Sequence, residues 1–294
     1  MTDLRQSPQW AKYMEALGWK VETTDNCQVY IKKLPLGLGS IIKILRSNPP
    51  IPFEEIDKIA KKHRAWFVKL EPGIRGHRSE IIGQRSPEHG FHASQWPLTP
   101  TKTIQVDLRK SVKRLWADLK KETRNVIRKA SQNHVVITQS ESIEQFCYLW
   151  VKSMRRKGNL FATGEQIKNM WQAFDENAHL LLAPQLTNTT QPVAGALIIT
   201  YDQVASYIFA ASAEQGNKIG APSLIVWEAI LLAKKLGCKI FDFEGIYDPR
   251  CHKATKSWQG FTRFKKGFGG KEVEYVGSFI KCYNRLLQPL ASSF

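Results

Sequence analysis

The chain has 294 residues and a mass of 33.6 kDa, and 43 Lys and Arg against 26 Asp and Glu give it a formal net charge of +17. A hydrophobic fraction of 43%, with 11% aromatic residues, excludes a chain that is disordered throughout. No stretch approaches the ~20 uninterrupted apolar residues of a membrane-spanning helix, since the best run, residues 224–233, contains Glu228. At roughly 150 residues per domain, the length predicts two domains or one large one.

The first residues and the cysteines indicate a reduced, cytoplasmic protein. Residues 1–10 lack the apolar segment of a secretory signal. The 5 cysteines are scattered without a C-x-x-C pair, which predicts neither a disulfide framework nor a zinc site. We expect no metal, because neither His89-x-x-His92 nor the Cys251–His252 pair has a third ligand at a suitable spacing.

The excess of positive charge predicts a polyanionic partner, because unbalanced charge of one sign destabilises a compact protein by self-repulsion. The alternative is a basic surface that only aids solubility. Basic residues cluster at 61–64, 109–129, 155–157 and 263–271, without a recognised nucleic-acid-binding motif. The charge therefore indicates a polyanionic partner, and it does not indicate sequence-specific recognition of that partner.

The first hundred residues predict a helix, two strands, a second helix and a strand. Ser7-Pro8 is typical of a helix start, and the apolar stripe that follows ends at Gly18. Residues 73–100 are rich in Gly, Pro, Ser and His without a clear period, which predicts a loop and a domain boundary. The predicted helices cover residues 8–17 and 53–64, and the predicted strands lie within 20–34, 41–45 and 65–70.

The rest of the chain predicts an α+β fold with a mostly antiparallel sheet. After a strand at 103–108, one long helix over 112–130 has an apolar stripe and a face of Lys and Arg, which should carry its charge outward. Both halves show a similar order of elements, and on this basis alone we conjecture an internal duplication. The other predicted strands are 135–138, 180–183, 193–201, 205–211 and 238–243, and the other helices are 143–156, 166–174 and 221–236.

Residues 260–270 interleave three cations and three phenylalanines among four glycines. Such a loop can hold phosphate through backbone N–H groups, lysine charge and aromatic stacking. The alternative is a basic, glycine-rich hairpin, and no glycine pattern here fits Walker A or a dinucleotide fingerprint.

Asp242 and Glu244 follow a predicted strand, where sites often form. Either carboxylate could act as a general base or orient a partner, and a structural turn capped by Asp is equally compatible. No G-x-S-x-G elbow is present, and residues 215–221 do not match the glycine spacing of an acyl-CoA-binding turn.

Segments in a fixed order resemble the FemABX family of peptidoglycan-bridge aminoacyltransferases. The resemblance includes the R-x-x-I-R-K-A sequence at 124–130 and the opening Q-S-P-Q-W-A-K at 6–12, so it covers nearly the whole chain. The segments that carry the rest are 207–212, 221–230, 233–237, 241–246 and 260–270.

The resemblance implies two tandem GNAT-like domains with mixed, mostly antiparallel sheets and a cleft between them. The first domain, on the precursor side, would comprise residues 1–96 and 275–294. The second, residues 97–274, would hold the aminoacyl-tRNA and the reaction centre. The implied reaction transfers an amino acid from aminoacyl-tRNA to an amine of a peptidoglycan precursor stem peptide and builds interpeptide bridges.

The resemblance also implies roles for individual residues. Phe264 and Lys265 match a Phe-Lys pair near the reaction centre, where a cation can stabilise the oxyanion formed when an amine attacks an ester. Lys12 matches a lysine that binds the precursor phosphate, and Glu71 stands where the family often has an Asp facing the acceptor. The implied substrate-binding residues are Lys12, Glu71, Tyr207, Phe209 and Asp242. The implied tRNA-binding residues are Arg124, Arg128, Lys129, Arg263 and Lys266.

Two departures favour a lipid-linked precursor over a nucleotide-linked one. Residues 159–163 lack the arginine of members that use a soluble nucleotide-linked precursor, and Phe209 replaces their tyrosine. We expect a monomer without a cofactor. A C-terminal apolar stripe could contact the inner face of the membrane, or pack onto the first domain. Its residues are Phe279, Ile280, Tyr283, Leu286, Leu287 and Leu290.

Two other functions stay open. One is a GNAT-like N-acyltransferase that uses a CoA or carrier-protein thioester on a polysaccharide or lipid amine. The other is a non-catalytic module that binds RNA or a membrane surface. Binding of bare tRNA without any product would favour the module, because counterion release drives such binding irrespective of chemistry.

Overall fold

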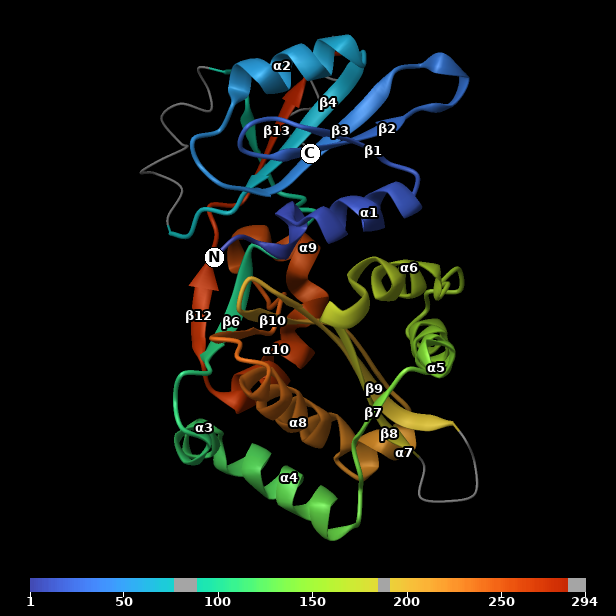
Figure 1. The fold of residues 1–294 in the computed structure, drawn as a ribbon, viewed down its shortest axis with the longest axis vertical. Helices are drawn as coiled ribbons and strands as arrows, with labels where there is room; N and C mark the ends of the chain where they lie inside the picture. The colour runs from blue at the N-terminus through green and yellow to red at the C-terminus, as the bar shows by residue number, and fades with distance from the viewer. Residues whose placement is uncertain (77–88, 185–190, 285–294) are drawn as a thin grey trace. The chain divides into compact units, whose positions relative to one another are not determined.

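The computed structural model describes residues 1–76, 89–184 and 191–284, and these divide into two compact units. The N-terminal unit takes its described residues from Thr2–Thr103, Gly245–Thr262 and Glu272–Phe294. The central unit comprises Met1, Ile104–Glu244 and Arg263–Lys271. Figure 1 shows the elements of both units.

The N-terminal unit is built on a six-stranded sheet. The parallel pair β3–β4 has the helix α2 between its strands in the chain, and the pairs β1–β2, β2–β3, β4–β13 and β13–β5 are antiparallel. In sheet order the strands are β1 (Lys20–Thr23), β2 (Gln28–Lys33), β3 (Ser40–Ser47), β4 (Ala65–Pro72), β13 (Ser278–Cys282) and β5 (His92–Ser94).

Alternation along these strands gives the sheet two apolar faces. Val29, Ile31, Ile42 and Ile44 point into a core closed by Ile56 and Ala60 of α2 (Phe53–Lys62). Tyr30 points the opposite way, and its hydroxyl donates to the Arg5 carbonyl at 2.6 Å, next to α1 (Pro8–Ala16).

The predicted start and end of α1 are confirmed. Ser7 Oγ accepts from the Trp10 amide at 3.0 Å, Pro8 is the first helical residue, and Gly18 has a φ of +74°. The predicted strands of the N-terminal unit and the helix over 53–64 are also confirmed. The predicted loop 73–100 contains the short strand β5, and its residues 77–88 lie outside the described part of the chain.

Side-chain contacts tie residues 245–262 into the N-terminal unit. Thr101 Oγ1 donates to Asp248 Oδ2 at 2.5 Å, and Arg250 donates to the carbonyls of Thr101 and Tyr275 at 3.1 Å. This segment contains the short helices η4 (Pro249–Cys251), α9 (His252–Thr255) and η5 (Lys256–Trp258).

The central unit contains most of a seven-stranded sheet. The pair β10–β11 is parallel, and the pairs β6–β11, β9–β10, β8–β9 and β7–β8 are antiparallel. In sheet order the strands are β12 (Lys271–Glu274), β6 (Lys102–Asp107), β11 (Ile240–Asp242), β10 (Val204–Ser212), β9 (Pro192–Tyr201), β8 (Ala178–Pro184) and β7 (Thr138–Ser140).

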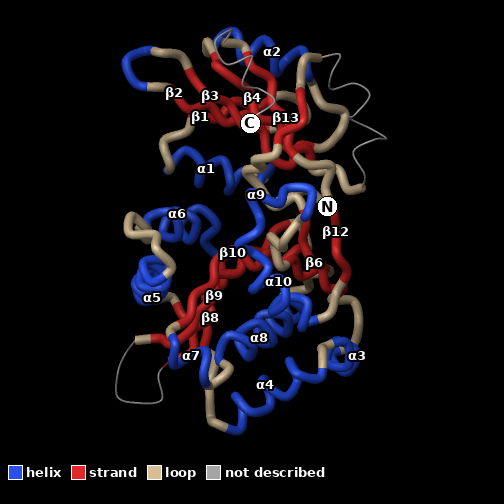
Figure 2. The backbone as a smooth tube through the Cα atoms, turned by 180° about the vertical axis from the view of Figure 1, so that it is seen from behind, coloured by secondary structure: helices blue, strands red, loops and turns tan. Residues whose placement is uncertain are grey.

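Helices cover both faces of this sheet, which explains why most of β9 is buried. Figures 1 and 2 show α8 on one face and α5 and α6 on the other, with α4 packed against the outside of α8. The helices of this part of the chain are α3 (Val112–Asp118), α4 (Lys121–Gln132), α5 (Ile143–Arg156), α6 (Glu165–Phe174), α7 (Glu214–Lys218), α8 (Ala221–Lys235) and α10 (Gln259–Lys265), followed by η6 (Lys266–Phe268).

The two sheets share one topology. The order β1-β2-β3-β4-β13 in the N-terminal sheet matches β8-β9-β10-β11-β6 in the central sheet, with the parallel pair at the same place. In both, helical chain crosses between the parallel strands, as parallel pairing requires. The predicted α+β class with mixed, mostly antiparallel sheets is confirmed, and the shared order supports the conjectured duplication.

The prediction of a single helix over 112–130 is wrong, because the chain forms α3 and α4 with a break between them. Leu119 and Lys120 are extended, with ψ angles of 146° and 150°. Leu119 is buried, and the Lys120 amide donates to the Gly267 carbonyl at 2.9 Å. The Gly267 carbonyl, distant in sequence, therefore accepts from the Lys120 amide, which in a continuous helix would donate to a carbonyl of the same helix.

The prediction of a glycine-rich loop or hairpin over 260–270 is also wrong. The segment is helical through α10 and η6, and Gly269 and Gly270, with φ of +77° and +86°, end it. Phe264 and Phe268 are four residues apart and their rings meet at 5.2 Å, as helical spacing allows. Burial of these rings outweighs the low helix propensity of glycine.

No helix among residues 1–76, 89–184 and 191–284 is long and apolar enough to cross a membrane. Of the predicted C-terminal stripe, Phe279 and Ile280 are buried in the N-terminal unit. Tyr283 is half-buried, and its hydroxyl donates to Asp57 of α2. The stripe residues Leu286, Leu287 and Leu290 lie outside the described residues.

Candidate active site around Lys265

The candidate site lies where β11 ends in the middle of the central sheet. β11 runs parallel to β10, with Ser206 beside Asp242, and antiparallel to β6. The Phe243 amide still donates to Ile104 of β6 at 3.0 Å, so the strand ends just beyond Asp242. The carboxyl end of a parallel strand is where α/β sheets often form sites.

Asp242 shapes the turn that follows β11. Its carboxylate is buried, and it accepts from Gln105 Nε2 and from the Glu244 amide, both at 2.7 Å. Glu244 has a φ of +59°, a left-handed conformation that is uncommon for residues other than glycine. Such strained residues often mark functional sites, and here the hydrogen bond from the Glu244 amide to the Asp242 carboxylate stabilises the strained conformation.

Lys265 ends α10 and reaches into this turn. Its side chain is buried, only 8% exposed, and Nζ donates to the Phe243 carbonyl at 2.7 Å. Burial lowers the pKa of Lys265 to about 8, and the charges of Glu244 and Asp242 oppose that shift. At pH 7 the ammonium form therefore exceeds the neutral amine by about ten to one.

A cluster of aromatic rings includes Phe243, the residue whose carbonyl accepts from Lys265. Phe243 contacts Phe241 at 5.1 Å, Phe268 at 5.6 Å and Tyr207 at 6.0 Å, measured between ring centroids. The half-buried Phe264 packs on Phe268. Burial raises the pKa of Tyr207, so its hydroxyl stays protonated at neutral pH. Phe209 lies further along β10, with its ring 6.1 Å from that of Trp150.

A cationic surface adjoins the site through η6. The Lys120–Gly267 hydrogen bond joins the start of α4 to η6, and an added Cβ on Gly267 would lie 2.3 Å from Thr123 Oγ1. The solvent-exposed cations of α3, α4, α10 and η6, with that of the residue before α4, are Lys113, Arg114, Lys120, Lys121, Arg128, Lys129, Arg263 and Lys266. Four of the five predicted tRNA-binding residues thus belong to this surface, which we call the α4–η6 surface.

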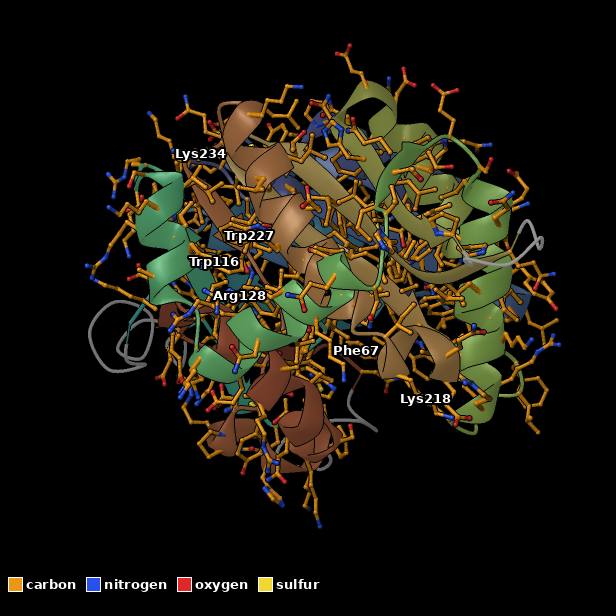
Figure 3. All side chains as sticks on the ribbon, turned by 90° about the horizontal axis from the view of Figure 1, so that it is seen from below. Phe67, Trp116, Arg128, Lys218, Trp227 and Lys234 are labelled. Carbon is orange, nitrogen blue, oxygen red and sulfur yellow. The ribbon has the colours of Figure 1, made fainter. Side chains whose placement is uncertain are left out.

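Arg124, the fifth, is half-buried and occupied within the fold. Its guanidinium donates to the Ala117 carbonyl at 3.0 Å and to the Leu119 carbonyl, which satisfies acceptors at the end of α3. Arg128 lies 5.5 Å from the ring centre of Trp116, which in turn packs on Trp227 of α8. Figure 3 shows these three side chains together.

Two predicted substrate-binding residues belong to the N-terminal unit. Lys12 is exposed on α1. Glu71 is buried at the end of β4, and its carboxylate accepts from the Leu98 amide at 2.5 Å, the Thr99 amide at 2.7 Å and Thr99 Oγ1 at 2.6 Å. These bonds give Glu71 a structural role in holding the segment before β6.

Within the central unit the structure thus brings together Lys265, Phe264, Tyr207 and Asp242. Sequence reasoning offered Glu244 as a possible general base beside Asp242, and it did not assign Gln105 to the site. No cluster of three or more His, Cys, Asp or Glu residues suited to a metal occurs in the described parts of the chain. His252 Nδ1 instead lies 3.0 Å from the Tyr247 hydroxyl.

The arrangement provides a buried ammonium donor at a turn that carries the carboxylates of Asp242 and Glu244. In such a desolvated place a fixed donor interacts strongly with negative charge that develops on a bound molecule. The site is therefore suited to steadying an oxyanion.

A sequence family and several solved structures are similar to this chain. Residues 184–293 match the model of the FemAB family, a range that includes β10, β11 and α10 with Lys265. No curated protein sequence matches the chain.

Three solved structures share the fold. The crystal structure of FemX matches with a TM-score of 0.81 and 18% identity, over 98% of this chain and 94% of that one. L-PGS from Bacillus licheniformis matches with a TM-score of 0.60 and 11% identity, over 95% and 88% of the two chains. A tandem GNAT protein from the clavulanic acid biosynthesis pathway matches with a TM-score of 0.54 and 11% identity, over 87% and 79%.

These likenesses show a tandem GNAT-like fold. The predicted resemblance to the FemABX family is therefore confirmed, in sequence by the FemAB match over residues 184–293 and in fold by FemX over nearly the whole chain.

Proposed function

We propose that this protein transfers an amino acid from aminoacyl-tRNA to an amine of a peptidoglycan precursor stem peptide. The observation that carries the proposal is the buried Lys265 ammonium at the end of β11, inside the segment that matches the FemAB family.

The chemistry needs little beyond positioning and charge stabilisation, because an aminoacyl ester is already activated. The acceptor amine attacks the ester carbonyl, a C–N bond forms, and negative charge builds on the carbonyl oxygen. Lys265 Nζ donates to that oxygen, with Phe264 beside it. The C–O bond to the tRNA ribose then breaks, and the proton lost by the amine ends on the released hydroxyl.

The α4–η6 surface supports tRNA as the donor. It places exposed Arg and Lys side chains on helices that adjoin the Lys265 turn through the Lys120–Gly267 hydrogen bond. Phosphate contacts by such side chains fix the position of a nucleic acid without reading its sequence. Arg128, Lys129, Arg263 and Lys266 would hold the tRNA backbone in this way.

For the acceptor we propose a lipid-linked precursor, with Lys12 binding its phosphate and Tyr207, Phe209 and Asp242 shaping the substrate site. The absence of the nucleotide-type arginine in residues 159–163 supports this choice. Such an acceptor would bring the protein to the inner face of the membrane.

Packing at α8 disfavours the alternative that uses a CoA thioester. A helix start after a parallel crossover strand is a ready phosphate-binding place. At this one, Val126 of α4 lies against Gly220, and an added Cβ there would be 2.8 Å from Val126 Cγ1. An element of the fold therefore covers the start of α8.

The test is transfer from pooled radiolabelled aminoacyl-tRNAs to lipid II, with an RNase control. We expect Lys265→Ala to lose most transfer, by about a hundredfold or more, because one oxyanion donor contributes about that much. Lys234→Ala is the matched control, since Lys234 Nζ also donates to a carbonyl, that of Leu108, at 2.7 Å.

Full transfer by Lys265→Ala at unchanged thermal stability would remove the lysine from the mechanism. Binding of charged and uncharged tRNA with equal affinity, and no product with any acceptor, would favour the non-catalytic module instead.

A further inference from the structure

The loop between α5 and α6 projects two large apolar side chains into solvent. Leu160 is 70% exposed and Phe161 is 94% exposed. Single exposed apolar residues are ordinary on protein surfaces, but two adjacent ones at a loop tip form a small apolar patch. Figures 1 and 2 both show the connection between α5 and α6 at the margin of the central unit.

This loop is fixed by the fold on both sides of its tip. The amides of Lys157 and Asn159 both donate to the Met154 carbonyl, and Gly158 has a φ of +91°, the geometry that commonly ends a helix. Beyond the tip Ala162 is buried, and an added Cβ on Gly164 would lie 2.7 Å from Cys147 Cβ. The backbone thus holds Leu160 and Phe161 outward.

Positive charge surrounds the apolar tip. Between residues 152 and 168 the chain has five cations and one acid, Glu165. A groove of about 960 Å³ between α5 and α6 is lined by several of these cations and by Tyr148, which is 52% exposed. The cations of the segment are Lys152, Arg155, Arg156, Lys157 and Lys168.

We propose that the α5–α6 loop docks the protein on an anionic lipid bilayer, with Leu160 and Phe161 entering the acyl boundary and the exposed cations Lys152, Arg155 and Lys157 facing lipid phosphates. Apolar tips flanked by Lys and Arg bind such surfaces because burial and electrostatic attraction act together. Tyr148 is suited to the interface, where amphipathic rings gather. Leu160 offers no stacking face for a nucleobase, which favours lipid over single-stranded RNA as the occupant.

The experiment is flotation of the full chain with vesicles of phosphatidylglycerol or of phosphatidylcholine. We expect binding to phosphatidylglycerol, weakened by salt, and little to phosphatidylcholine. The double variant Leu160→Ser/Phe161→Ser should bind at least about tenfold more weakly, because it loses two buried apolar side chains. Lys152→Gln/Arg155→Gln should also bind more weakly.

The controls remove the same groups elsewhere: Leu36→Ser, at a side chain 95% exposed in the N-terminal unit, and Lys58→Gln/Lys61→Gln on α2. Both should bind as the unaltered protein does, and thermal unfolding should show that all variants are folded.

No binding to phosphatidylglycerol, or equal binding by the loop-tip variant, would overturn the proposal. So would a loop-tip variant that loses affinity for single-stranded RNA but not for vesicles. The inference does not rest on the transfer reaction, since its readout is binding alone.

Discussion

Lys265 is placed where the fold opposes its charge. Its side chain is only 8% exposed, and burial lowers its pKa from the ordinary 10.5 to about 8. Below pH 8 the lysine is charged in both the folded and the unfolded chain, so the folded state bears the full cost of burying that charge. Between pH 8 and 10.5 the unfolded chain binds more protons, and stability from this group rises with pH.

Replacing this lysine should therefore stabilise the protein at neutral pH. We expect Lys265→Met to raise the free energy of unfolding by about 1–3 kcal/mol at pH 7. Removing the buried charge should stabilise the protein by more than loss of the hydrogen bond to the Phe243 carbonyl destabilises it. The advantage should shrink as the pH rises from 8 to 10.5. Urea unfolding across that range measures it, with Lys234→Met as the control. This expectation would be contradicted if Lys265→Met were less stable than the unaltered protein at pH 7 and if the stability of both changed with pH in the same way.

Resemblance to the family identified Lys265, but its burial and its contact with the Phe243 carbonyl depend on β11, α10 and the aromatic rings meeting in space. Glu244 illustrates the same limit, because nothing in the residue itself indicates a positive φ. For Asp242, the sequence allowed either a functional carboxylate or one that caps a turn, and its observed hydrogen bonds are those of a turn cap.

Among the helices, those with local signals were predicted to within a residue or two. The predicted bounds of α5 and the predicted starts of α1 and α8 match the structure, because capping, proline and apolar spacing act within one turn. The break between α3 and α4 depends instead on the contact of Lys120 with Gly267, more than a hundred positions away, and α10 is held by side-chain contacts that no local signal shows, such as that of Lys265 with the Phe243 carbonyl.

The junction between α4 and η6 leaves no room for a side chain at position 267. Gly267→Ala would place its Cβ 2.3 Å from Thr123 Oγ1, so we expect a loss of about 1–3 kcal/mol in the free energy of unfolding. Thr123→Ala removes the opposing oxygen, and the double variant should regain most of the loss. A double-mutant cycle by urea unfolding measures the coupling. Strictly additive effects would show that the two residues do not oppose each other.

For the whole molecule, the net charge of +17 favours binding to polyanions whatever the reaction. The logarithm of the binding constant falls linearly with the logarithm of the salt concentration, because cations of the protein displace counterions from phosphates. The salt slope therefore counts the phosphates that a surface neutralises.

The α4–η6 surface should account for a definable part of that slope. We expect Arg128→Gln/Lys129→Gln to reduce the slope of tRNA binding by about 1.5, because each phosphate that the protein no longer neutralises lowers it by about 0.7–0.9. Lys58→Gln/Lys61→Gln on α2 should leave the slope unchanged. Titrations at several salt concentrations measure both. Equal reductions in the two variants would point to diffuse attraction rather than to this surface.

The place of β13 has a consequence for how the chain is made. β13 lies between β4 and β5, yet a ribosome polymerises the entire central unit before it reaches residues 278–282. Until then β4 keeps an unpaired edge, and edges of this kind recruit foreign strands. During translation the central unit can thus mature first, whereas the N-terminal unit waits for residues 278–282 before its sheet is complete.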